Sequence, residues 1–89
     1  MNQSREENTF VLCQANKVAG RMSDVGVQGG CRVVRVREDS GFTSLFKLSA
    51  NRRTRILVEK QWVRCSPVMD DIIRRAVKIY DGEMVAKPF

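Results

Sequence analysis

Apolar and polar residues alternate through the stretch CRVVRVR, and this pattern predicts a β-strand over residues 31–37. Successive side chains of a strand point to opposite faces of a sheet. Val34 and Val36 therefore share one face with Arg32, and Arg35 and Arg37 share the other.

The stretch EDSG follows this strand at residues 38–41. Its acidic and hydroxyl side chains can bond back to the backbone, and its glycine permits positive φ, so we expect a hairpin turn. A second strand is expected over residues 42–50, followed by a turn at residues 51–53.

A third strand is expected over residues 55–64, which are rich in Ile, Leu, Val and Trp. Within it, the apolar Trp62 falls in phase with the basic Lys60 and Arg64. We interpret this mixture of apolar and basic residues on one side as a sign of a β-bulge near Glu59 and Lys60.

The N-terminal part of the chain has a helical pattern. Ser4 and Glu7 fit a capping box, and an apolar stripe with spacings of three and four residues predicts a helix over residues 5–23. Gly20 weakens this helix, and residues 9–13 are alternatively a strand.

A second helix is expected after Ser66 and Pro67, because a hydroxyl N-cap followed by proline is a strong helix start. Met69, Ile72, Ile73, Ala76 and Tyr80 form its apolar stripe. Two acidic residues stand four positions before two arginines, which predicts the ion pairs Asp70–Arg74 and Asp71–Arg75. Asp81 and Gly82 are expected to end it.

The predicted fold class is α+β, with the order αβββα: a three-stranded antiparallel sheet with two helices packed on one face. We expect one domain over residues 1–89, with residues 1–4 as an N-terminal arm and 83–89 as a C-terminal tail. This order is similar to that of double-stranded-RNA-binding domains. Where that family's second helix begins with lysines, this chain has Asp70 and Asp71, so we carry no site residue over from it.

Composition favours a small soluble domain. The chain has 89 residues, of which 43% are hydrophobic and 29% charged, and it has no apolar run near the roughly 20 residues that a membrane-spanning helix needs. The N-terminus lacks the pattern of a secretory leader. Cys13, Cys31 and Cys65 are odd in number and widely spaced, which favours reduced thiols in a cytoplasmic protein.

The net charge of +6 lies entirely in the centre of the chain. Residues 32–64 hold nine basic residues against three acidic ones, whereas the flanking segments are each neutral. Seven of the nine are arginines, whose planar guanidinium groups bind phosphate with two parallel hydrogen bonds.

The sequence predicts neither an enzyme nor a cofactor or metal site. It has no histidine, no CxxC pair and no glycine-rich phosphate loop, and its paired acidic residues stand in first helical turns, where the helix dipole favours them.

We instead predict a nucleic-acid-binding protein, contacting DNA or RNA mainly through the phosphate backbone. The predicted binding residues are Arg35, Arg37, Lys47, Arg52, Arg53, Arg55 and Arg64, with Thr43 on the same open side of the sheet. Trp62 and Phe46 would stack on bases if exposed and would otherwise belong to the core.

One alternative is a protein-interaction module, for example a small phage or mobile-element inhibitor that docks on an acidic surface of a host protein. A solvated sheet edge also explains a cluster of basic residues, since such residues block aggregation. A homodimer formed through an edge strand or through the first predicted helix is a further possibility, and no membrane contact is expected.

Overall fold

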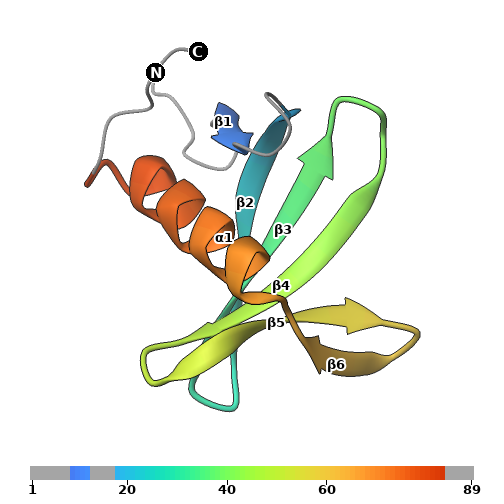
Figure 1. Ribbon diagram of the computed structural model, residues 1–89, viewed down its shortest axis with the longest axis vertical. Helices are drawn as coiled ribbons and strands as arrows, with labels where there is room; N and C mark the ends of the chain where they lie inside the picture. The colour runs from blue at the N-terminus through green and yellow to red at the C-terminus, as the bar shows by residue number, and fades with distance from the viewer. Residues whose placement is uncertain (1–8, 13–17, 84–89) are drawn as a thin grey trace.

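The computed structural model describes residues 9–12 and 18–83. Over these residues the elements are β1 (Thr9–Leu12), β2 (Val18–Gln28), β3 (Cys31–Glu38), β4 (Thr43–Ser49), β5 (Arg52–Val58), β6 (Gln61–Arg64) and α1 (Pro67–Tyr80). The six strands form one antiparallel sheet in the order β1 to β6, so each strand pairs with the next along the chain (Figure 1).

The predicted N-terminal helix over residues 5–23 is wrong in its described part, which forms strands. β2 takes up Val18–Gln28 and pairs with β3, and β1 confirms the alternative of a strand after residue 8. Valines favour strands, and a glycine inside a helix costs about 0.5–1 kcal/mol, so the apolar stripe alone could not hold a helix against a pairing partner. The predicted cap at Ser4 and Glu7 lies outside the described residues.

The predicted αβββα order with two helices on a three-stranded sheet is therefore replaced by a larger antiparallel sheet and one helix among the described residues. The similarity to double-stranded-RNA-binding domains rested on that order and is withdrawn with it. The class α+β remains an adequate description of the domain.

The hairpin predicted between residues 31–37 and 42–50 is confirmed. β3 and β4 pair with Arg35 opposite Leu45 and Arg37 opposite Thr43. Gly41 has a φ of 99°, a conformation that glycine adopts without the steric penalty of a side chain.

The predicted bulge near Glu59 and Lys60 is in fact a turn, which divides the expected third strand into β5 and β6. Both residues have positive φ, 49° and 71°, and two consecutive positive φ values are typical of the tight type I′ hairpin turn. Pairing then continues with Val58 opposite Gln61 and Leu57 opposite Trp62. Trp62 and Arg64 therefore share one face of β6, while Lys60 lies in the turn.

Helix α1 begins and ends as predicted. The Ser66 hydroxyl accepts a hydrogen bond from the Met69 amide at 3.1 Å, and the helix ends at Asp81, whose amide bonds back to Val77. Its ion pairs Asp70–Arg74 and Asp71–Arg75 are both present.

One face of the sheet carries α1, as Figure 1 shows. The core lies between them and contains Met22, Val34, Val36, Phe46, Cys65, Ile72, Ile73, Ala76, Val77 and Tyr80. Arg32 fastens the far end of the helix to this face by bonding to Asp24 of β2 and, through two nitrogens, to Asp81. No helix in the described part of the chain is long and apolar enough to cross a membrane.

Candidate functional site

The face of the sheet opposite α1, called here the open face, holds a row of three cations. Because Phe46 packs beneath the helix, alternation places its neighbour Lys47 on the open face. Lys47 lies directly opposite Arg55 of β5, and Arg55 lies directly opposite Arg64 of β6. Like charges in directly opposed positions destabilise a sheet, so this basic row is a feature that folding alone would not favour.

A surface hollow of about 540 Å³ adjoins the row. It is lined by Asn51, Arg52, Arg53, Arg55 and Arg64, and we call it the arginine hollow. None of these lining residues is acidic. A cavity with four guanidinium groups and no carboxylate is suited to an anion with several oxygens, such as a phosphodiester backbone.

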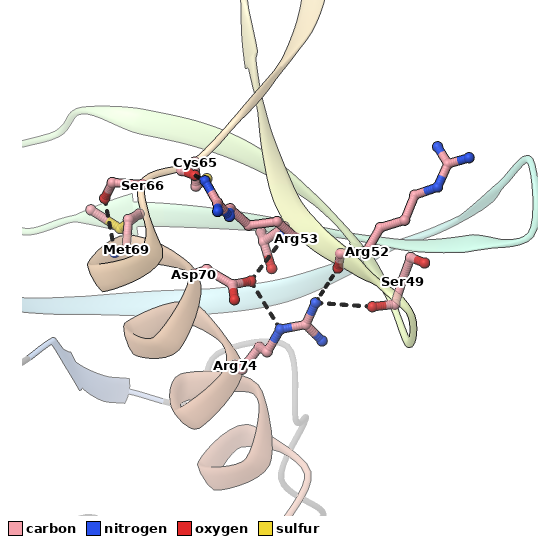
Figure 2. Close-up of polar contacts among 9 residues, drawn as sticks. Ser49, Arg52, Arg53, Cys65, Ser66, Met69, Asp70 and Arg74 are labelled. Carbon is pink, nitrogen blue, oxygen red and sulfur yellow. Dashed lines mark hydrogen bonds and ion pairs between the residues drawn. The ribbon is translucent and has the colours of Figure 1, made fainter.

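The turn between β4 and β5, directly before Arg52, is held in place from the helix side. Arg74 of α1 donates hydrogen bonds to the backbone carbonyls of Ser49 and Arg52, the first at 3.0 Å (Figure 2). Arg74 is itself fixed by Asp70 at 2.9 Å. The Arg52 side chain points away from this network and toward solvent, as Figure 2 shows.

Asp70 also anchors β5 directly, since its carboxylate accepts the Thr54 amide hydrogen bond at 2.8 Å. Partial burial acts to raise the pKa of Asp70, but the hydrogen bond from Thr54 and the ion pair with Arg74 outweigh burial, and the pKa is lowered. The charged carboxylate thus links the first turn of α1 to the strand that carries Arg53 and Arg55.

Arg53 and Arg55 are held more firmly than Arg52. Arg53 donates a hydrogen bond to the carbonyl of Cys65 at 3.3 Å (Figure 2). Arg55 is half-buried, with Nη2 3.9 Å from the sulfur of Cys31, and its Nε is buried without a partner among the described residues. Buried donors are usually satisfied, so the Arg55 guanidinium has bonding capacity to spare beside the arginine hollow.

Arg35 and Arg37 lie on the same face but at a distance from the arginine hollow. Both are exposed. Lys47 is opposite Val33, and Arg37 stands four residues further along β3, about 13 Å at the rise of a strand. The sheet thus divides the seven predicted binding residues into a group of five around the arginine hollow and a separate pair on β3.

An apolar row runs beside the basic row. Leu45, Leu57 and Trp62 precede or follow Lys47, Arg55 and Arg64 by two residues each, and Leu57 is opposite Trp62. With Val33 they line a second hollow of about 470 Å³, called here the apolar hollow, which Lys60 and residues 25–28 of β2 complete. Because strands β2 and β6 line one hollow, the sheet must curve toward its open face.

Trp62 stands at the boundary of the two rows. It is half-buried on the open face and lies outside the core beneath α1. The ammonium group of Lys47 lies 4.5 Å from the centre of its ring, in cation–π contact. Phe46, which the sequence offered as a second stacking residue, is 4% exposed and belongs to the core.

Almost none of the basic residues in the central part of the chain forms an ion pair with another described residue. Of the nine basic residues between positions 32 and 64, only Arg32 forms an ion pair within the described chain. On the helix side, Asp70, Asp71 and Asp81 are instead paired with Arg74, Arg75 and Arg32, respectively.

Sequence reasoning missed two contributors to the site: Lys60 on the open face, and Asp70 of α1, which supports β5 from the opposite face. Lys60 lines the apolar hollow, but it was assigned to a β-bulge in the sequence, and that assignment gave no reason to predict it as a binding residue. The sequence predicted only the ion pair of Asp70 with Arg74. That its carboxylate also accepts a hydrogen bond from the Thr54 amide of β5 could be seen only in the tertiary structure.

Other chemistry is sparse among the described residues. No cluster of three potential metal ligands occurs in them. Cys65 is buried, which raises the pKa of its thiol, and Cys31 is half-buried. Cys13 lies outside the described residues.

No family model matches this chain, and no curated protein sequence or solved structure matches it significantly.

Proposed function

We propose that this protein binds nucleic acid, DNA or RNA, through the open face of its sheet. The arginine hollow and the basic row would neutralise backbone phosphates, and little base reading is required for this mode of binding. The cytoplasm is the compartment in which we place this activity, and we propose no catalytic step.

The observation that carries the proposal is the juxtaposition of Lys47, Arg55 and Arg64 in a directly opposed row. Such a row raises the free energy of the folded state unless an anion compensates it. Local rules of folding are commonly broken at functional sites, where a ligand restores the balance.

A second support is the way in which charge is distributed over the domain. On the helix side, Asp70, Asp71 and Asp81 are paired with Arg74, Arg75 and Arg32, respectively, whereas the arginine hollow has no acidic lining residue. Surfaces with unneutralised positive charge attract polyanions over long distances and raise their rate of association.

The test is a fluorescence-anisotropy titration of duplex DNA, duplex RNA and single strands at two salt concentrations. It compares the wild type with Arg52→Ala/Arg64→Ala, which alters two exposed arginines of the hollow. The matched control is Arg75→Ala/Lys78→Ala, which removes the same charge from exposed positions on α1.

We expect the hollow variant to lose affinity at least tenfold and the control variant to retain it. Affinity should fall with salt, with a log-log slope of about 0.9 per phosphate on duplex DNA and about 0.7 on single strands. Equal binding by both variants, or no binding of any nucleic acid at low salt, would refute the proposal and favour an acidic protein surface as the partner.

A further inference from the structure

The apolar hollow lies next to the arginine hollow on one continuous surface. Each residue of the apolar row stands two positions from a residue of the basic row, a separation of about 7 Å along the strands. A ligand that fills both hollows must carry an anionic group and a flat apolar group close together. A nucleotide unit has this construction, because one sugar joins its phosphate to its base.

Trp62 gives the apolar hollow the chemistry that a base requires. Its indole is half-buried and fixed by the Lys47 ammonium group at 4.5 Å, so part of the ring is held in position and part remains accessible. Bases stack on aromatic side chains regardless of their identity, and a nearby cation strengthens such sites.

The base faces of a duplex are covered by their neighbours in the stack, whereas those of a single strand can be splayed onto a protein. We infer that the open face takes single-stranded nucleic acid, with a base in the apolar hollow against Trp62 and the adjoining phosphates in the arginine hollow. This inference rests on the proposed function and narrows its ligand.

The inference accounts for two features that phosphate binding leaves unexplained. Val25 and Val27 are 54% and 76% exposed at the rim of the apolar hollow, on a surface otherwise rich in charge. Lys60 holds a positive φ of 71° at the same rim, where glycine would be the easier residue. A base entering the hollow would cover the valines and lie beside Lys60.

Trp62 is the only tryptophan of the chain, so its emission reports directly on the apolar hollow. The experiment titrates the full-length protein with oligo-dT, oligo-U, an abasic oligonucleotide of equal length and a duplex of equal length. Affinity is measured by anisotropy, and the emission of Trp62 is recorded at saturation with each probe.

We expect oligo-dT and oligo-U to quench Trp62 and to bind at least fivefold more tightly than the abasic strand. The preference between the two tells DNA from RNA. Trp62→Leu should weaken single-strand binding by about 5- to 100-fold, as the loss of one stacked base implies, and leave abasic binding unchanged. Phe42→Leu is the matched control, since Phe42 is 63% exposed in the β3–β4 turn and lines neither hollow.

Equal affinity for oligo-dT and the abasic strand, with unchanged emission at saturation, would overturn the inference while leaving phosphate binding intact. A duplex that binds as tightly as the single strands would also overturn it. Failure of every probe to bind would remove the proposed function itself. The quenching measurement uses the wild-type protein, so a Trp62 variant that does not fold leaves the test decisive.

Discussion

Arg55 lies directly opposite Arg64 in the antiparallel pairing of β5 and β6. Both guanidinium groups border a hollow that has no acidic lining residue, and Lys47 faces Arg55 from its other side. Three basic side chains in directly opposed positions on one face destabilise the folded sheet, so a function such as anion binding is needed to explain their arrangement.

Reversing one charge of this row should raise stability and lower nucleic-acid binding together. Arg64→Glu would place a carboxylate opposite Arg55, and we expect the free energy of unfolding to rise by about 0.2–1 kcal/mol. Urea denaturation followed by circular dichroism measures the stability, and anisotropy measures the affinity. Arg64→Gln should fall between the two, and a variant less stable than the wild type would show that the row is not repulsive.

The two groups of basic residues on the open face should contribute unequally to binding. Arg35 and Arg37 stand away from the arginine hollow along β3, so Arg35→Ala/Arg37→Ala should cost less affinity than Arg52→Ala/Arg64→Ala. In Arg35→Ala/Arg37→Ala, the slope of log affinity against log salt concentration should also decrease less, because each lost phosphate contact removes about 0.7 from this slope on single strands. Equal losses in a salt titration of the two variants would instead indicate one ligand path across the whole face.

The tight turn between β5 and β6 offers a separate test. Residues with side chains at positive φ cost roughly 1–2 kcal/mol relative to glycine, and Asn-Gly is the preferred pair for a type I′ turn. Glu59→Asn/Lys60→Gly should therefore raise the melting temperature measured by circular dichroism. Glu59→Asn alone keeps Lys60 at the rim of the apolar hollow and should bind single strands better than the double variant.

The hairpin of β3 and β4 and the helix after Ser66 were predictable because their signals are local. Alternation, turn residues and an N-cap act within a few positions of the chain. The residues of β2 have an apolar stripe with helical spacing, and it is their pairing with β3 that makes them a strand. Local propensity yields to such tertiary pairing because each strand gains a full ladder of backbone hydrogen bonds.

The same distinction applies to the candidate site. Which basic residues share a face followed from alternation, so Arg35, Arg37 and Lys47 could be placed together from the sequence. The separation of Arg35 and Arg37 from the arginine hollow could not be predicted, because it depends on the register of strand pairs. The contact of Lys47 with Trp62 likewise needed the turn at residues 59 and 60, which brings β6 back along β5.

Asp70 joins α1 to β5, and its charge should make the stability of the domain depend on pH. Its folded-state pKa is below the ordinary value of 3.8, so its contribution is fully present above that value and is lost as the pH falls through the lowered pKa. Asp70→Asn keeps an acceptor for the Thr54 amide but removes the charge that Arg74 requires. We expect it to cost about 1–3 kcal/mol at pH 6, as is typical of hydrogen bonds to charged groups.

The neighbouring Asp71 provides the control for this prediction. Its side chain is 62% exposed, compared with 23% for Asp70, and its only recorded partner in the described chain is Arg75 at 3.2 Å. Asp71→Asn should therefore change stability by less than about 0.5 kcal/mol. Urea titrations between pH 2 and pH 6 should show the difference between wild type and Asp70→Asn shrinking below about pH 4. A difference that persists unchanged at pH 2 would mean that the ionised carboxylate does not hold the helix to the strand.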